Sequence, residues 1–80
     1  VYIAVRDLEK PENYLINKYN INFVEVEEVK KSGAVTIAAK ALQMLDHCDL
    51  IYVSFDVDSI DSRFSTGTGT PVPNGLTVEE

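Results

Sequence analysis

The fold is decided by two stretches, VYIAVR at residues 1–6 and LIYVSF at residues 50–55. Each is a nearly continuous run of apolar and β-branched side chains, of the kind that is buried on both faces in a parallel sheet. The two runs therefore predict one strand over residues 1–6 and another over residues 50–55. Between them, Phe23, Val24 and Val26 predict a third and shorter strand.

Two helices are expected between these strands. The first runs from Pro11 to about Tyr19, since a proline opens it and Glu12 follows in its first turn. The second runs from about Ser32 to Asp46, where apolar side chains recur at helical spacing. These side chains are Ala34, Ile37, Ala38, Ala41, Leu42 and Leu45. Because strands and helices alternate, the sequence indicates an α/β fold with a mostly parallel sheet.

The composition is that of a globular segment, with 45% apolar and 25% charged residues. The net charge is −6, and no basic cluster is longer than the pair Lys30 and Lys31, which argues against a nucleic-acid partner. No apolar run approaches the roughly 20 residues that cross a bilayer. The single cysteine, Cys48, cannot form an internal disulfide. We therefore expect a cytoplasmic protein with no nucleic-acid or membrane partner.

The length of the chain limits what it can form by itself. Eighty residues make at most one small domain, whose core supplies only a few kcal/mol without a disulfide or a metal. The chain also starts at Val1 rather than at methionine. We therefore expect residues 1–80 to be an internal fragment of a single larger domain, incomplete at both ends.

Asp56 and Asp58 are the candidate metal ligands. Along an extended strand, residues two apart share a face, so both carboxylates are expected on one face at the end of the strand over residues 50–55. Two converging carboxylates repel each other unless a proton or a cation neutralises them. A hard divalent ion that prefers oxygen ligands is the natural occupant, and Mg²⁺, Ca²⁺ and Mn²⁺ all qualify.

Other interpretations of this pair are possible. Asp56 and Asp58 can simply cap the following turn. Asp61 and the run TGTGTP at residues 66–71 favour a metal, because glycines let the backbone pass close to a site and threonine hydroxyls can hold metal-bound carboxylates. A calcium EF-hand loop starting at Asp56 fails, since its sixth and twelfth positions are Asp61 and Gly67. A metal-dependent sugar-nucleotide transferase fits the spacing but does not explain residues 66–71.

Three segments together resemble the arginase/agmatinase (ureohydrolase) family. The long and specific ones are SFDVDSID at residues 54–61 and GTGTPVPNGLT at residues 67–77. A weaker one is RDLE at residues 6–9, which is similar to the Arg-Asp-x-Asp/Glu segment of arginases. The resemblance is strongest to arginase. It implies a fragment of a three-layer α/β/α fold with a mostly parallel sheet.

The resemblance also implies two Mn²⁺ ions per active site in the parent protein. By position, Asp56 bridges the two ions and Asp58 binds one of them, while Asp61 is not a direct ligand. Ser54 and Thr70 look like supports of the metal-bound carboxylates. In the family, the ions activate water for attack on a guanidinium carbon, which releases urea.

For the substrate, the resemblance implies a small guanidino compound, L-arginine, which is hydrolysed to ornithine and urea. It places Glu9 near the α-amino group of that substrate, whereas the alternative is that Glu9 only begins the helix at Pro11. Agmatinase and formimidoylglutamase of the same family are alternative activities. A non-catalytic ureohydrolase-like protein is an alternative of another class. Arginases also imply a homo-oligomer, a trimer or a hexamer.

The chain departs from the family in two ways. Ser62 and Thr66 stand where many members have proline, both in the loop between the matching segments. The upstream His/Asp ligands, the catalytic histidine and the downstream guanidinium-binding glutamate have no counterpart in residues 1–80. We therefore expect no catalytic residue within the fragment and no activity from the fragment alone.

Overall fold

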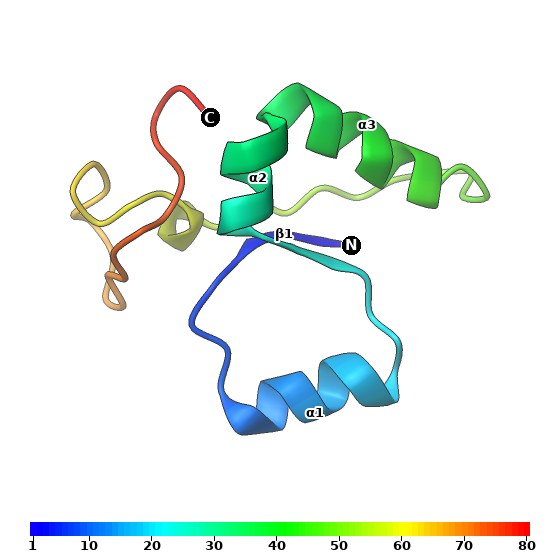
Figure 1. Cartoon of the computed structure of the whole chain (residues 1–80), viewed down its shortest axis with the longest axis horizontal. Helices are drawn as coiled ribbons and strands as arrows, with labels where there is room; N and C mark the ends of the chain where they lie inside the picture. The colour runs from blue at the N-terminus through cyan, green and yellow to red at the C-terminus, as the bar shows by residue number, and fades with distance from the viewer.

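The computed structural model describes residues 1–80 and has a short parallel sheet at its centre (Figure 1). Strand β1 (Tyr2–Val5) pairs with strand β2 (Phe23–Glu25), with Tyr2 opposite Phe23 and Ile3 opposite Val24. Helix α1 (Lys10–Lys18) connects the two strands. The parallel pair and the connecting helix confirm the predicted α/β class. They also confirm the strands predicted at residues 1–6 and at residues 23–26.

Strand β1 is irregular at its carboxyl end. Its register with β2 shifts between Ile3 and Val5, and the buried Ala4 between them has a φ of 64°. Such a bulge bends the strand and changes where the following side chains point. Asp7 also lies in the left-handed region, with a φ of 55°. Two residues in the left-handed region, Ala4 and Asp7, therefore flank the end of β1 and Arg6, where the chain leaves the sheet.

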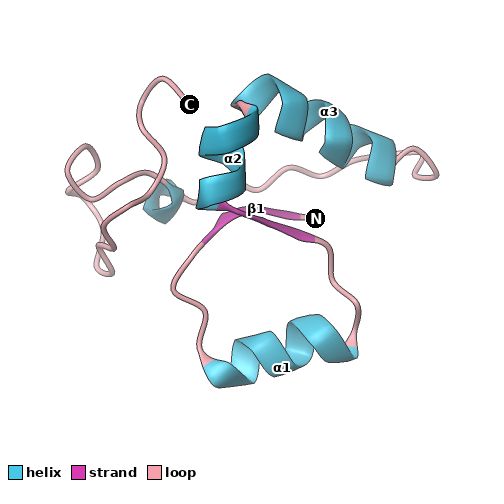
Figure 2. Cartoon of the chain, viewed as in Figure 1, coloured by secondary structure: helices cyan, strands magenta, loops and turns pink.

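Helix α1 begins and ends within one residue of the predicted bounds. Pro11 occupies its first turn, and the N–H of Glu9 donates to Glu12 Oε2 at 2.7 Å. This contact satisfies a backbone donor that has no partner inside the helix. None of the residues of α1 is buried, and the helix stands apart from the sheet (Figure 2).

Two helices follow β2 where the sequence predicts one. Helix α3 (Ala34–Met44) confirms the helix predicted from Ser32 to Asp46. Helix α2 (Val26–Ser32) was not predicted, and it takes Val26 out of the third strand. Its signal is weak, because only Val26 and Val29 are apolar in a charged segment. Gly33, with a φ of 85°, separates the two helices.

The hydrophobic core is small and lies between β2, α2 and α3. It consists of Val24, Val29 and Ile37, with Ala34 and Leu76 packed against it. Leu76 comes from the C-terminal loop, so this loop is attached to the helices by apolar contact.

The strand predicted over residues 50–55 is absent, and this prediction is wrong for the structure. The sheet has two strands, and residues 50–55 make no backbone hydrogen bond to another segment. Leu50 and Tyr52 are 90% and 91% exposed. An apolar pattern predicts a tendency to pair, but a strand also needs a neighbouring strand to supply hydrogen bonds. The expected placement of Asp56 and Asp58 on one face of a strand end is therefore also wrong.

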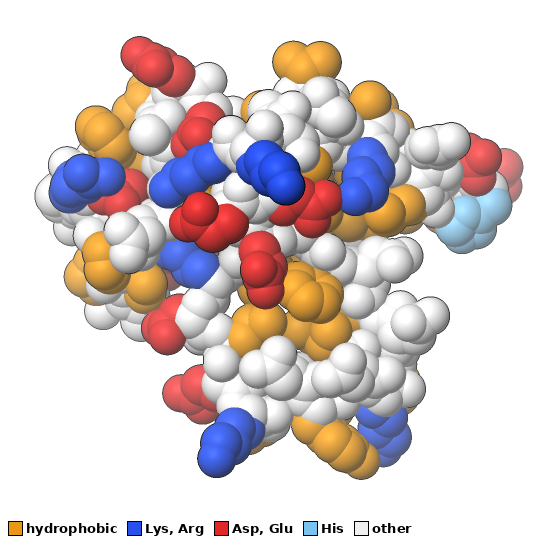
Figure 3. Space-filling view, viewed as in Figure 1, with side chains coloured by type: hydrophobic (Ala, Val, Ile, Leu, Met, Phe, Trp, Pro, Cys, Tyr) orange, Lys and Arg blue, Asp and Glu red, His pale blue; other side chains and the backbone are white.

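The chain exposes more surface than a compact domain of its mass. Its accessible surface is 6286 Å², whereas about 4,800 Å² is expected for a folded monomer of this mass. Its radius of gyration is 13.3 Å, against about 11.6 Å for a compact domain of this length. Apolar side chains lie open between α1 and the rest of the molecule (Figure 3). None of the helices combines the length and the apolar character that a membrane span requires.

Candidate metal centre

Asp56 stands at the start of a 3-10 helix, η1 (Val57–Ser59), rather than at the end of a strand. Its Oδ1 accepts a 3.0 Å hydrogen bond from the N–H of Asp58. The capping interpretation is therefore correct for this oxygen. Oδ2 of Asp56 has no hydrogen-bond donor, and the side chain is exposed, so this oxygen is free to bind a cation.

Asp58 holds its two carboxylate oxygens in different surroundings. Oδ2 accepts a 2.5 Å hydrogen bond from the hydroxyl of Thr70. Oδ1 is buried and has no hydrogen-bond partner. A buried carboxylate oxygen without a donor raises the free energy of the folded state, because its hydrogen bonds to water are lost and no protein donor replaces them. A cation at Oδ1 would remove this cost, so Asp58 fits the role of a metal ligand.

The electrostatic surroundings keep Asp58 ionised. The hydroxyls of Thr68 and Thr70 lower the pKa of its carboxyl, and the charge of Arg6 lowers it further, while desolvation opposes them. Hydroxyl donors close to the charged form of an acid favour that form, and of these two only Thr70 makes a hydrogen bond to Asp58. Asp58 is therefore a carboxylate over the pH range in which a divalent ion binds.

The run at residues 66–71 contributes hydroxyls rather than a close approach of backbone. The N–H of Thr70 donates to the hydroxyl of Thr68 at 3.2 Å, which fixes the two threonines relative to each other. A Cβ atom added at Gly67 or Gly69 would meet nothing within 4 Å. The close backbone approach expected at these two glycines is not seen.

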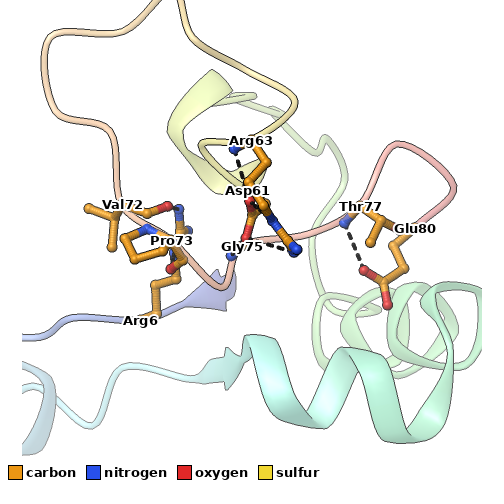
Figure 4. A network of polar contacts seen from close by, with 8 residues as sticks. All are labelled: Arg6, Asp61, Arg63, Val72, Pro73, Gly75, Thr77 and Glu80. Carbon is orange, nitrogen blue, oxygen red and sulfur yellow. Dashed lines mark hydrogen bonds and ion pairs between the residues drawn. The ribbon is translucent and has the colours of Figure 1, made fainter.

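Asp61 is fully buried and serves the loop itself. Its Oδ1 accepts from the N–H and Nε of Arg63 at 2.9 and 2.8 Å, and its Oδ2 accepts from the N–H of Gly75 at 3.1 Å (Figure 4). The side chain of Arg63, followed by its backbone N–H, holds the pKa of Asp61 well below its usual range. Since both oxygens have protein donors, Asp61 is not available to a metal.

Gly75 lies directly against the backbone of Asp61. The N–H of Asp61 donates to the carbonyl of Leu76 at 2.8 Å, and the N–H of Leu76 donates to the carbonyl of Ser59 at 2.9 Å. A Cβ atom at Gly75 would lie 2.5 Å from the nitrogen of Asp61. The loop that contains Asp58 and the C-terminal loop therefore run side by side and in contact.

Arg6 holds the backbone around Asp58, and the sequence did not single it out for this role. From the end of β1, its guanidinium donates to the carbonyls of Asp58 at 2.6 Å and Val72 at 2.9 Å, and to those of Ser59 at 3.4 Å and Pro73 at 3.2 Å. Figure 4 shows Arg6 beside Val72 and Pro73. The only signal in the sequence was the position of Arg6 in the segment at residues 6–9.

A cleft of about 570 Å³ opens between the end of β1, the start of α2 and the loop at residues 72–74. Its charged lining comes from Arg6, Asp7, Glu25 and Glu27. Glu9 does not line this cleft and instead lies exposed at the start of α1.

The structure brings together some of the residues that the sequence singled out. Asp56, Asp58 and Thr70 form one cluster through hydrogen bonds. Ser54 is exposed and makes no hydrogen bond to this cluster, and Glu9 makes none either. No three side chains of His, Cys, Asp or Glu gather around one point. Residues 1–80 therefore contain two neighbouring carboxylates, Asp56 and Asp58, but no group of side chains that could hold a metal ion without further ligands.

Comparison with known proteins gives a consistent result over the whole chain. The model of the arginase family matches residues 1–80. The arginase of Entamoeba histolytica is 34% identical over 80 residues, which are 100% of this chain and 27% of that protein. Arginase-2, mitochondrial, of Mus musculus is 34% identical over 82 residues, which cover 100% of this chain and 23% of that protein.

Solved structures agree with the sequence match. The crystal structure of Entamoeba histolytica arginase in complex with L-ornithine superimposes with a TM-score of 0.91 at 35% identity, over 98% of this chain and 27% of that one. The arginase of Bacillus subtilis superimposes with a TM-score of 0.87 at 28% identity, over 94% of this chain and 27% of that one. The chain belongs to the arginase family, and it spans about a quarter of the length of these relatives.

Proposed function

We propose that the full-length protein is a binuclear manganese hydrolase that cleaves the guanidinium group of L-arginine to give ornithine and urea. The observation that carries this proposal is the carboxylate of Asp58, whose Oδ1 is buried without a partner while Oδ2 is held by Thr70. Membership in the arginase family supports it. The complex of Entamoeba histolytica arginase with L-ornithine supports an amino acid of this kind as the product.

Each residue of the cluster has a defined part in this proposal. Asp56 would hold both ions, and Asp58 would hold one of them through the oxygen that has no protein donor. Thr70 keeps Asp58 from rotating, because its hydroxyl holds the other oxygen. When bound, the ions supply Lewis acidity and a hydrolytic nucleophile near neutral pH.

Asp56 and Asp58 are an incomplete ligand set for two ions. The remaining ligands and the acid–base group then come from other parts of the parent protein, of which the chain spans about a quarter if the parent is as long as its relatives. The excess surface and the exposed apolar run at residues 50–55 support a chain that is one part of a single larger domain.

The test is to measure metal content and urea release in the full-length protein. We expect about two Mn²⁺ ions per subunit and urea from L-arginine. Asp58→Asn should lose one of the two ions and the release of urea. Asp49→Asn is the matched control, since Asp49 is exposed and makes no hydrogen bond through its side chain. A wild-type protein that binds no manganese or releases no urea would refute the proposal. A preference for agmatine would assign the protein to agmatinase, and an inactive protein would be a non-catalytic relative.

We further propose that the protein acts in the cytoplasm as a homo-oligomer, a trimer or a hexamer. Residues 1–80 carry a net charge of −6 and have no Lys/Arg cluster, so this part of the protein does not favour nucleic acid or an acidic membrane as a partner. Light scattering on the purified full-length protein gives the oligomeric state, and cell fractionation gives the compartment. A monomer, or a protein recovered in organelles, would contradict this proposal.

A further inference from the structure

We infer that Arg6 is a positioning residue of the metal centre: its guanidinium clamps the backbone of Asp58 and Ser59 to that of Val72 and Pro73 and so fixes how Asp58 is presented. The inference rests on the proposed function, because it concerns the same metal centre. It adds a role for a residue that touches neither a carboxylate nor a substrate.

The contacts of Arg6 join three parts of the chain that are distant in sequence. Its Nη2 donates to the carbonyls of Asp58 and Val72, at 2.6 and 2.9 Å. Its Nη1 donates to Ser59 at 3.4 Å, and its Nε to Pro73 at 3.2 Å. All four acceptors are backbone carbonyls, and Arg6 has no ion pair with an acid. The cation therefore binds main chain, and its charge acts on the carboxylate of Asp58 without direct contact.

These contacts act on both sides of the Asp58 carboxylate. One side is the backbone of Asp58 itself, which Nη2 holds directly. The other side is Thr70, whose hydroxyl binds Asp58 and which lies two residues before Val72. If the loop at residues 72–73 moves away, Thr70 moves with it. Arg6 therefore controls the distance between a metal ligand and the hydroxyl that orients it.

An arginine is needed because the four carbonyls lie around one planar group. The guanidinium presents five N–H donors in a fixed fork, whereas a lysine presents three donors on one nitrogen. Arg6→Lys keeps the charge and most of the length, but one ammonium cannot span both loops. This variant separates the geometric role of Arg6 from its charge.

The experiment compares Arg6→Lys and Arg6→Gln with wild type in the full-length protein. We expect Mn²⁺ affinity to fall by about 10- to 100-fold, as is usual when a group that orients a ligand is lost. Excess Mn²⁺ should restore kcat, and KM for arginine should stay within about twofold of wild type, because Arg6 is not proposed to contact the substrate. Arg63→Lys is the matched control, since Arg63 holds Asp61 in the same loop and does not contact Asp58; its Mn²⁺ affinity should stay near wild type.

Two results would overturn the inference. In the first, Arg6→Lys lowers the melting temperature but leaves Mn²⁺ affinity unchanged, which means that Arg6 only stabilises the fold. In the second, Arg63→Lys weakens manganese binding as much as Arg6→Lys, which means that any loosening of the loop has this effect. If wild type binds no manganese, the proposed function fails. A crystal structure of Arg6→Lys then shows whether Arg6 holds the two loops together. Separated loops at residues 58–59 and 72–73 support it, and unmoved loops refute it.

Discussion

The hydroxyl of Thr70 donates a 2.5 Å hydrogen bond to Oδ2 of Asp58, across 12 positions of sequence. This bond gives the two oxygens of one carboxylate different tasks, because Oδ1 stays buried and without a donor. A carboxylate held by one oxygen cannot rotate freely about its own axis, so the other oxygen is fixed in direction. In the proposed site, the threonine would hold Asp58 in the orientation that a metal ion needs.

Thr70→Val should therefore weaken metal binding with little change in fold. Valine has the shape of threonine but no hydroxyl, so Oδ2 of Asp58 loses its donor. We expect Mn²⁺ affinity of the full-length protein to fall by about tenfold, at the lower end of the effect of such partners. Calorimetric titration with Mn²⁺ measures it. Thr70→Ser retains the hydroxyl and should stay close to wild type; equal losses in the two variants would mean that the methyl group, not the hydrogen bond, matters.

The two aspartates should differ in how much metal their loss removes. In the proposed site Asp56 serves both ions and Asp58 only one, so Asp56→Ala should leave the protein with fewer ions than Asp58→Ala. Elemental analysis of the purified variants gives ions per subunit. Full occupancy in both variants would rule out these ligand assignments, and a larger loss in Asp58→Ala would reverse them.

The sequence predicted the elements that local pattern determines. Residues 2–5 form the strand that their continuous apolar run predicts, because β2 pairs with them, and α3 forms the helix that the spacing of its apolar side chains predicts. It missed α2, in which Val26 and Val29 are the buried apolar residues within one charged segment. It was wrong at residues 50–55, where a strand requires hydrogen bonds from a neighbour that the pattern cannot supply.

The candidate site divides in the same way. Asp56 and Asp58 were found because two acids separated by one residue, directly after an apolar run, are visible in the sequence. The turn that they form, the contact between Thr70 and Asp58, and the clamp of Arg6 depend on loops that meet only in three dimensions. An arginine that donates only to backbone carbonyls leaves no pattern in the sequence, because any residue can supply the acceptor.

Gly75→Ala should destabilise the protein. A Cβ atom at this position would lie 2.5 Å from the backbone nitrogen of Asp61, so the two loops must separate to admit it. Overpacking of this kind costs about 1–3 kcal/mol. Urea denaturation of the full-length protein measures the change. Gly67→Ala is the control, since a Cβ atom there meets nothing within 4 Å, and its free energy of unfolding should change by less than about 0.5 kcal/mol.

Asp61 should make the stability of the protein depend on acid pH. Arg63 lowers the pKa of Asp61 in the folded state, whereas the unfolded state has the ordinary value near 3.9. The stabilising contribution is then present above about pH 4 and is lost as the pH falls toward the folded-state pKa. Melting temperatures from pH 7 to pH 2 should show wild type well above Asp61→Asn at neutral pH, with the difference shrinking below about pH 4.

Arg63→Met provides a milder form of the same test. It removes the side-chain ion pair but leaves the N–H of Arg63 and that of Gly75 on the carboxylate. We expect the same dependence on pH with a smaller difference from wild type. A difference that stays constant down to pH 2 would show that Asp61 stabilises the loop by packing rather than by its charge.

The last prediction concerns the choice of substrate and rests on Glu9. The structure places Glu9 at the start of α1, where its N–H is bound by Glu12, and it leaves the proposed contact with the α-amino group of arginine as a prediction. If that contact exists, Glu9→Gln removes a charge-assisted hydrogen bond, so kcat/KM for arginine should fall by about 1.5–3 kcal/mol, on the order of 10- to 150-fold. Agmatine keeps this amino group and lacks only the carboxylate, so its hydrolysis should fall as well. Hydrolysis of 5-guanidinopentanoic acid, which is arginine without the α-amino group, should be nearly unchanged. Glu12→Gln is the matched control, because it weakens the same helix start and leaves the charge of Glu9 in place. Parallel kinetics on arginine and 5-guanidinopentanoic acid decide the matter: equal losses on the two compounds, or the same loss in Glu12→Gln, would show that Glu9 acts only on the helix.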